Sequence, residues 1–272
     1  MKDIKEITEK LEQGVKEIYE SEKYKAYLDF MGKFWDYSFN NCVLIMMQKP
    51  EATLVAGYRA WQNKFKRFVK KGEKGITILA PCPKKYTKEV EDENGNIEVK
   101  EINYTTFRAC TVFDISQTEG EEVPNIVREL SESVENYAEL LDKLITLSPV
   151  PVAFEDVQGG ANGYYSHVEK RIVIKAGMGE MQTVKTLVHE ISHAILHNKD
   201  DGEEMEATKH EKEVQAESVA YTVCNALGLD TSDYSFGYIA GWSKGKEMKE
   251  LSASMEVIRK TAKAIIEDLR AA

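Results

Sequence analysis

The spacing of apolar residues at the start of the chain predicts an amphipathic helix over residues 2–20. Apolar positions recur there every three or four residues and so fall on one helix face; they are Ile4, Ile7, Leu11, Val15 and Ile18. A second helical stretch, over 21–48, is rich in aromatic residues and ends before Pro50, where a helix is disfavoured. The chain therefore opens with two predicted helices.

Shorter apolar runs follow and indicate strands. Asn94-Gly95 is a strong turn dipeptide and predicts a hairpin between the runs on either side of it. The elements predicted for this part are a strand at 52–56, a helix at 58–69, a strand at 76–80, a hairpin of 86–90 with 97–103, and a strand at 105–115.

A polar stretch around 117–125 carries Gly and Pro without periodicity and marks the predicted domain boundary. Two domains are expected, at 1–120 and 126–272, the first α/β and the second with its mixed sheet before its helices, for an α+β chain. The elements predicted for the second domain are a helix at 126–147, a strand at 151–155, a hairpin of 164–167 with 171–175, and helices at 180–198, 208–227, 233–241 and 245–270.

The composition argues against a membrane-spanning or secreted protein. The chain has 272 residues, 42% of them hydrophobic, and a net charge of −10, as expected for a folded soluble protein. No apolar run approaches the roughly 20 residues that cross a bilayer, and the charged N-terminus lacks the apolar core of a secretory signal. The four cysteines are scattered, so we expect reduced thiols in a cytoplasmic protein with no membrane partner.

Positive charge is concentrated in residues 58–88, the basic segment. It holds ten basic residues and one acidic residue, for a charge of +9 on an otherwise acidic chain. Aromatic residues alternate with these cations, a combination that holds single-stranded DNA through its phosphates and bases. The competing interpretation is a solvated lysine-rich face, with Trp61, Phe65 and Phe68 turned into a core. The candidate DNA contacts are Tyr58, Arg59, Trp61, Lys64, Lys66, Arg67, Lys70, Lys71 and Lys74.

The motif His189-Glu190-Ile191-Ser192-His193 carries the sharpest chemical signal. On a helix, side chains four residues apart share a face, so both imidazoles can reach one Zn²⁺ ion. Glu190 is then placed to act as the general base that activates a water molecule. The surrounding apolar residues favour the helix that this motif needs.

A catalytic zinc site needs a third protein ligand. Glu213 and Glu217 stand four residues apart on the next predicted helix, and we assign Glu213 as the ligand. Glu217 is assigned to hydrogen-bond the outer nitrogen of a zinc-binding histidine, with the reverse assignment left open. His197 is expected at the surface or behind the ligands, and His210 is a weaker competitor.

A peptidase also needs a surface that holds its substrate. Residues 164–166 and 171–174 are expected to supply an edge strand with which an extended peptide can pair. Tyr164, Tyr238 and Trp242 are candidate pocket residues. Ordinary core packing is the competing interpretation for these aromatic side chains.

Together these residues resemble ArdC-type antirestriction proteins, the LtrC-like branch on mobile elements of Gram-positive bacteria. The similarity rests on the Trp61 helix, Val69–Gly75, Val112–Gly120, Tyr164–Ser166, the HEISH motif, Glu213-x-x-Ala216-Glu217 and Tyr238-Ile239-Ala240-x-Trp242. It implies an N-terminal single-stranded-DNA-binding domain and a zincin-like, gluzincin-type metallopeptidase domain related to the ImmA/IrrE peptidases. It also implies that His189, His193 and Glu213 bind zinc, that Glu190 is the catalytic base, and that the protein protects incoming conjugative DNA from restriction.

Three hypotheses follow. In the first, the N-terminal domain brings a zinc metallopeptidase to single-stranded DNA, where it hydrolyses an unknown protein substrate. In the second, the protein coats single strands without proteolysis and its metal site is structural. In the third, it is an ImmA-like peptidase that cleaves a repressor, which requires a protein partner.

Overall fold

The computed structural model describes residues 4–19, 21–91, 97–123, 137–198, 208–234, 236 and 239–271. The chain begins with α1 (Ile4–Ile18), α2 (Ser21–Lys33) and α3 (Phe39–Gln48). The first predicted helix is confirmed, but the single helix expected over 21–48 is wrong. Ser38 begins a new helix there, because its hydroxyl accepts a hydrogen bond from the backbone N–H of Asn41 at 3.4 Å.

The basic segment begins in a small structure built from short elements. β1 (Val55–Gly57) leads into α4 (Tyr58–Asn63), and β2 (Arg67–Val69) pairs with β5 (Thr118–Gly120), which follows the 3-10 turn η1 (Ile115–Gln117). The helix predicted over 58–69 therefore ends early, and its last residues form a strand. Lys66, with φ of 55°, makes the turn between helix and strand. At Gly120 a Cβ would lie 2.5 Å from the Lys66 carbonyl oxygen, so β2 and β5 can approach only because this residue is glycine.

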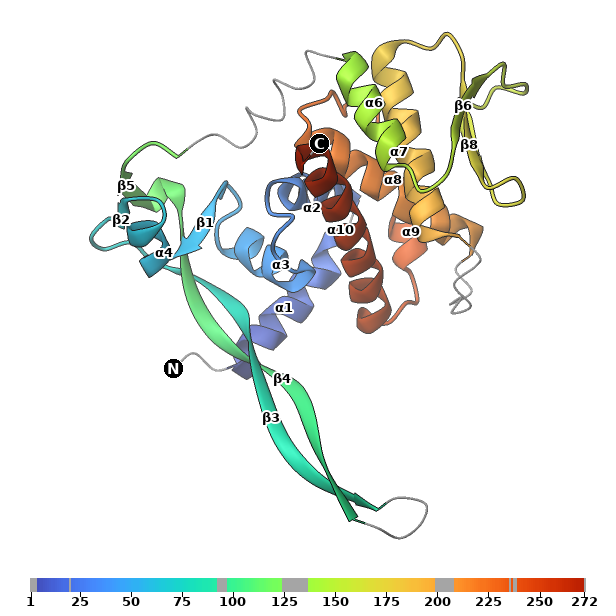
Figure 1. The fold of residues 1–272 in the computed structure, drawn as a ribbon. Helices are drawn as coiled ribbons and strands as arrows, with labels where there is room; N and C mark the ends of the chain where they lie inside the picture. The colour runs from blue at the N-terminus through green and yellow to red at the C-terminus, as the bar shows by residue number, and fades with distance from the viewer. Residues whose placement is uncertain are drawn as a thin grey trace.

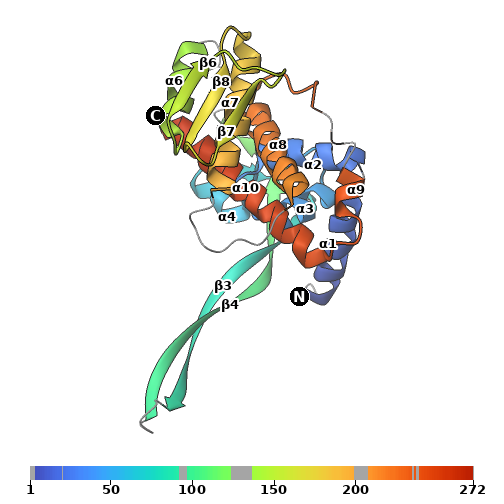
Figure 2. The ribbon, with the colours of Figure 1, turned by 90° about the vertical axis from the view of Figure 1, so that its right-hand side faces the viewer.

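The separate short strands predicted between 76 and 115 are, in the structure, two long ones. β3 (Ile76–Glu91) and β4 (Ile97–Asp114) pair antiparallel without interruption from Ile76 opposite Val112 to Glu91 opposite Ile97. The ribbon they form projects far from the rest of the molecule (Figure 1 and Figure 2).

Pro81 and Pro83 do not interrupt β3, because the backbone nitrogen atoms at these positions face away from β4. The N–H groups of Thr77 and Leu79 point away from β4 and donate to Gln48 and Asn41 of α3, each at 2.9 Å. N–H groups alternate in direction along a strand, so the two prolines occupy positions that also face away from β4. They remove no hydrogen bond of the β3–β4 ladder.

The second half of the chain forms a small sheet covered by helices. After α6 (Tyr137–Leu147), the strands β6 (Val152–Glu155), β7 (Gly163–Ser166) and β8 (Arg171–Lys175) assemble in the order β6-β8-β7. β8 pairs parallel to β6 and antiparallel to β7. The helices that follow are α7 (Glu180–Leu196), α8 (Lys209–Ala226), α9 (Ile239–Ser243) and α10 (Met248–Ala271).

These elements confirm the predicted hairpin and three of the four predicted helices after it, with shifts only at their ends. The helix expected over 233–241 is wrong at Asp233, Tyr234 and Phe236, which are not helical, and agrees with the start of α9 at 239–241; residues 235, 237 and 238 lie outside the described part of the chain. The first part of the helix predicted at 126–147 lies outside the described residues, as do residues 124 and 125 of the predicted boundary stretch at 117–125. The start of that stretch ends η1 and forms β5. The α+β class is confirmed.

The N-terminal helices and the C-terminal helices share one hydrophobic core. Buried polar contacts cross it: the Tyr24 and Ser218 hydroxyls are 2.8 Å apart, and the Tyr19 hydroxyl donates to the Leu251 carbonyl at 2.9 Å. Arg259 of α10 donates to the Trp35 carbonyl, also at 2.9 Å. The helix α8 packs against α2, α7 and α10. Among the described helices, none is long and apolar enough to cross a membrane.

Candidate metal centre

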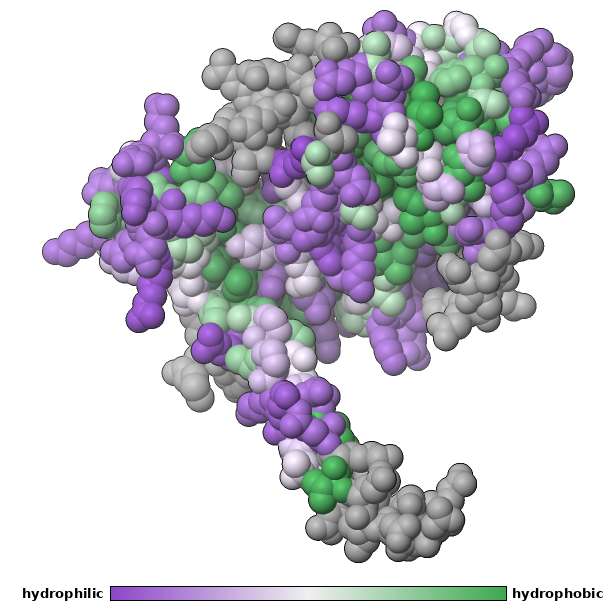
Figure 3. Space-filling model, in the orientation of Figure 1, coloured by the Kyte–Doolittle hydropathy of each residue, from purple (hydrophilic) through white to green (hydrophobic). Residues whose placement is uncertain are grey.

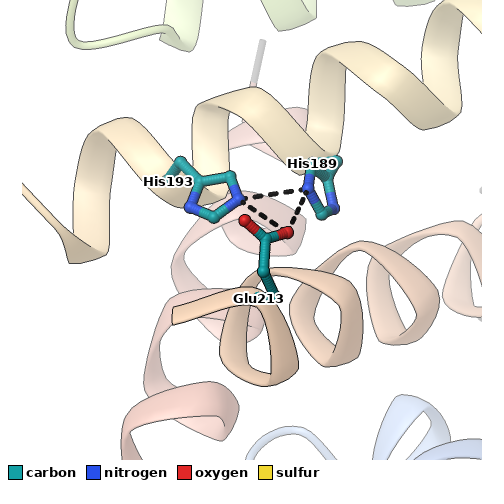
Figure 4. Close-up of side chains that lie close together, drawn as sticks. All are labelled: His189, His193 and Glu213. Atoms are coloured by element: carbon teal, nitrogen blue, oxygen red, sulfur yellow. Dashed lines mark hydrogen bonds and ion pairs between the residues drawn. The ribbon is translucent and has the colours of Figure 1, made fainter. Parts of the chain in front are cut away.

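The HEISH motif lies on α7, whose apolar side packs against the sheet and the neighbouring helices. Val184, Leu187, Val188 and Ile191 are all buried, and they hold α7 so that His189 and His193 face α8 (Figure 4). α8 begins with a capping box in which the Thr208 hydroxyl and the Glu211 carboxylate satisfy each other's backbone N–H groups. This capped first turn positions Glu213 opposite the two imidazoles.

The donor atoms of these three side chains converge on one point. His189 Nε2 and His193 Nε2 are 3.1 Å apart, and each lies 3.6 Å from Glu213 Oε2. Within the described part of the chain, these three residues are the group of His, Cys, Asp and Glu side chains whose geometry could hold a metal ion.

The geometry fits a tetrahedral ion. At ligand distances of roughly 2.0–2.1 Å, donor atoms around tetrahedral zinc are about 3.3 Å apart. The separations of 3.1 to 3.6 Å bracket that value. Two imidazoles and one carboxylate are also a donor set typical of catalytic zinc sites, in which a fourth position stays open.

Glu217 takes a different place from Glu213. Its Oε2 atom is 3.5 Å from His189 Nδ1, the nitrogen on the far side of the ring from the cluster. A carboxylate there can fix the tautomer and orientation of the ring so that Nε2 faces a metal. Burial raises the pKa of Glu217, while hydrogen bonds from His189 and His193 hold the pKa of Glu213 well below its usual range.

Glu190 lies next to the cluster. It is buried, and burial raises its pKa even though His189 and His193 and a hydrogen bond with the Tyr165 backbone act in the opposite direction. For His189, burial favours the neutral ring, but the surrounding carboxylates, Glu213 first, outweigh burial and raise its pKa.

The other two histidines near the motif do not join the three. His197 is buried rather than at the surface, with Nε2 3.2 Å from the Lys212 carbonyl oxygen, and burial lowers its pKa to about 4. It therefore packs behind His193, whose ring centroid is 5.4 Å away. His210 is exposed and lies outside the cluster.

A pocket of about 250 Å³ opens beside His189 and Glu190. Gly163 of the edge strand β7 and the polar side chains of Gln182, Lys185, Thr186, Asp233 and Tyr234 line it. Lys185 is buried, and its ammonium group contacts the Asp233 carboxylate at 2.6 Å. No motif in the sequence marks these pocket residues; the one available signal is the position of Lys185, one helical turn before His189.

The structure describes two of the three residues predicted to line the substrate pocket, and neither of these two lines it. Trp242 is buried in the core, with its ring 5.6 Å from that of Tyr19, so its assignment to the substrate pocket is wrong. Tyr164 is partly exposed on β7 but is absent from the pocket lining. Tyr238 lies outside the described residues.

The predicted DNA-contact residues are divided by the fold. Trp61 is fully buried and its Nε1 atom donates to the Phe113 carbonyl at 2.8 Å, so it cannot stack on a base. Arg67 is half-buried and donates to Thr118 and to backbone carbonyls of β5, which occupies its guanidinium. Both assignments are corrected for this reason.

The other predicted DNA-contact residues are exposed. They are Tyr58, Arg59, Lys64, Lys66, Lys70, Lys71 and Lys74. Of these, Lys70 donates to the Ser116 carbonyl at 3.1 Å.

Two family models match the chain. Residues 3–113 match the N-terminal domain of the anti-restriction factor ArdC, and residues 148–262 match the IrrE N-terminal-like domain, Peptidase_M78. An uncharacterized protein of Bacillus anthracis is 29% identical to this chain over an aligned length of 303 positions, gaps included. The alignment covers 96% of this chain and 50% of that protein. The chain thus spans about half the length of this curated relative.

Solved structures give a similar fold. The metal-free crystal structure of the antirestriction protein ArdC from the R388 plasmid has a TM-score of 0.53 and 21% identity, covering 86% of each chain. The Mn(II)-bound structure of that protein has a TM-score of 0.47 and 18% identity, covering 86% of this chain and 84% of the other. The first of these comparisons supports the arrangement of elements described above.

Proposed function

We propose that this chain, which matches the N-terminal domain of the anti-restriction factor ArdC over residues 3–113 and the IrrE N-terminal-like domain over residues 148–262, is a metal-dependent peptidase that binds single-stranded DNA. The observation that carries the proposal is the convergence of His189, His193 and Glu213 donor atoms within 3.6 Å of one another, beside the buried Glu190. Such a protein would protect incoming DNA in the cytoplasm.

The three converging side chains would hold Zn²⁺, and Glu217 would hold His189 in the required tautomer through Nδ1. The bound ion would supply the Lewis acidity that polarises a peptide carbonyl and lowers the pKa of a water molecule. Glu190 would take the proton from that water and return it to the departing amine. Its buried position keeps bulk water away from the proton it carries.

A peptide substrate would lie along β7. The sheet order β6-β8-β7 puts β7 at an edge of this sheet, and Gly163 and the backbone of Tyr165 bring that strand to the pocket and to Glu190. An extended peptide can add to such an edge through backbone hydrogen bonds. This arrangement would carry the scissile bond past the ligand cluster.

DNA binding is assigned to the exposed cations of residues 58–74, the first part of the basic segment, and to the exposed ring of Tyr58. Figure 3 shows hydrophilic side chains projecting around the β2–β5 region of the molecule. Local positive charge attracts phosphates even on an acidic protein, and the resulting affinity falls steeply with salt. The residues proposed to make these contacts are Tyr58, Arg59, Lys64, Lys66, Lys70, Lys71 and Lys74.

Metal analysis tests the peptidase site directly. Purified wild-type protein is titrated with Zn²⁺ and, separately, Mn²⁺, and its metal content is measured by mass spectrometry. We expect one tightly bound ion per chain, lost in His193→Ala and retained in His210→Ala, which removes an exposed histidine outside the cluster. A wild-type protein that takes up neither ion would overturn the proposed site.

A further inference from the structure

The β3–β4 ribbon separates residue types onto its two faces. Side chains alternate between faces along a strand, and directly paired residues of antiparallel strands share a face. The register pairs Ala80 with Arg108, Lys84 with Tyr104, and Tyr86 with Ile102. One face, here called the tyrosine face, therefore carries Lys84, Tyr86, Tyr104 and Arg108.

The two tyrosines form an exposed pair on this face. Their ring centroids are 5.5 Å apart with an angle of 72° between the ring planes. Tyr86 of β3 is 48% exposed and Tyr104 of β4 is 43% exposed. Packing in the core therefore does not account for these aromatic side chains.

Positive charge flanks the tyrosine pair. Lys84 lies directly across from Tyr104, and Arg108 lies four residues further along β4 toward the body, both exposed.

The opposite face has a different character. Its pairs include Pro81 with Phe107 and Thr87 with Glu101. Lys85, also on this face, forms an ion pair with Glu101 at 2.5 Å, so its positive charge is balanced locally. Phe107 is 54% exposed on this face, and the residue paired with it is Pro81, which carries no charge. Among the described side chains, exposed rings occur together with unbalanced positive charge on the tyrosine face.

We propose that the tyrosine face binds a single nucleic-acid strand. Lys84 and Arg108 contact phosphates, and bases stack on Tyr86 and Tyr104, which is the combination by which proteins hold single strands without reading their sequence. The inference rests on the proposed DNA-binding function, but it adds a contact surface that is separate from the residues near β2 and β5. The ribbon then acts as an arm that lies along the strand beyond the body.

Two variants distinguish the faces. The first carries Lys84→Gln, Tyr86→Thr, Tyr104→Thr and Arg108→Gln; the matched control carries Lys85→Gln and Phe107→Thr on the opposite face. Affinity for a fluorescent single-stranded oligonucleotide is measured by anisotropy at several salt concentrations, with thermal unfolding measured in parallel. Loss of stacking is expected to weaken binding by at least about tenfold, and loss of two cations to reduce the slope of log affinity against log salt by about 1.4. The control is expected to bind like the wild type.

A third variant, Tyr86→Phe with Tyr104→Phe, keeps both aromatic rings and is expected to retain wild-type affinity. This result would separate the loss of stacking from a general structural effect of substitutions in the ribbon. Equal affinity of the tyrosine-face variant and the wild type would overturn the inference, as would equal losses in the two faces' variants. If substitution of Lys64, Lys66, Lys71 and Lys74 weakens binding while the tyrosine-face variant does not, DNA binding stands and the ribbon contact fails. If the wild type binds no oligonucleotide, the proposed function itself fails.

Discussion

The candidate metal centre and the basic segment differ in whether the residues selected from the sequence lie together in the folded structure. At the metal centre, the motif histidines and the glutamate selected from the next helix come together within 3.6 Å. In the basic segment, the selected residues separate: Trp61 enters the core, Arg67 binds backbone carbonyls, and most of the lysines remain exposed.

The difference comes from the range of the interactions that place each residue. Two side chains four residues apart on one helix are neighbours wherever that helix lies. The exposure of Arg67 instead depends on the end of α4 at Asn63 and on pairing between β2 and β5, which are about fifty residues apart along the chain. A local pattern predicts the first arrangement; the second depends on distant segments.

The largest effect is expected for Glu190→Gln. Peptide hydrolysis should fall by about 10²–10⁴-fold because the general base is lost, while metal uptake should remain, because the substituted side chain is not a proposed ligand. Cleavage of a peptide library is followed by mass spectrometry for the zinc-loaded wild type and variant. Equal cleavage by both would remove Glu190 from the chemistry. A wild type that binds zinc but cleaves nothing would favour the strand-coating alternative.

Trp61→Ala is expected to lower the free energy of unfolding by about 3–5 kcal/mol, since it empties a fully buried site. Tyr58→Ala, at a side chain that is 50% exposed, should change stability far less and should weaken DNA binding instead. Urea unfolding and oligonucleotide binding are measured for both. A stably folded Trp61→Phe protein with reduced DNA affinity would contradict the division drawn between these two rings.

Glu217→Gln should weaken zinc binding by about 10–100-fold through loss of the carboxylate beside His189 Nδ1. The control is Glu180→Gln, at an exposed residue in the first turn of the same helix as the histidines. Competition with a chelator of known affinity gives both constants. Complete loss of zinc in Glu217→Gln together with retention in Glu213→Gln would exchange the roles of the two glutamates.

Asp114→Asn is expected to cost about 1–3 kcal/mol of stability near neutral pH. Asp114 is buried and accepts hydrogen bonds from the backbone N–H groups of Thr53, Leu54 and Ser116 at 2.8, 3.2 and 2.9 Å. Burial acts to raise its pKa, but these hydrogen bonds outweigh burial and lower it. The stabilisation is therefore present above the unfolded-state pKa and is lost as the pH falls through the lower folded-state pKa.

Denaturant unfolding of both proteins across the acid range measures this difference. The gap between wild type and variant should close as the pH falls. A gap that stays constant into acid would show that the charge of Asp114 contributes nothing to the pairing of β1 with β4, in which Asp114 lies opposite Val55.

Part of the fold followed from local patterns, and the errors have common causes. Apolar periodicity predicted α1 and α10, because each buries one face. The helices α7 and α8 were also predicted, although both are buried around most of their circumference. It failed at 21–48, where Ser38 starts a new helix inside an aromatic run, and at 58–69, where Lys66 turns the chain. In both places a single residue's hydrogen bond or backbone angle overrides a periodic pattern.

The ribbon illustrates the same limit for strands. The prolines at 81 and 83 suggested an interruption, but whether a proline breaks a strand depends on which way the N–H at that position would point. That direction is set by pairing with β4 and by the α3 amides that bind the other edge of β3 near the body. Neither is visible in the residues around the prolines.

The sequence by itself determined that His189 and His193 lie on one face of a helix, because helical spacing fixes which side chains of one helix are neighbours. It also determined the presence of a basic, aromatic N-terminal region. Only the tertiary structure decided that Glu213 faces both imidazoles while Glu217 lies behind one of them, that Trp61 belongs to the core, and that Tyr86 and Tyr104 share a face. Those outcomes depend on contacts between segments far apart in the chain, and no local pattern encodes them.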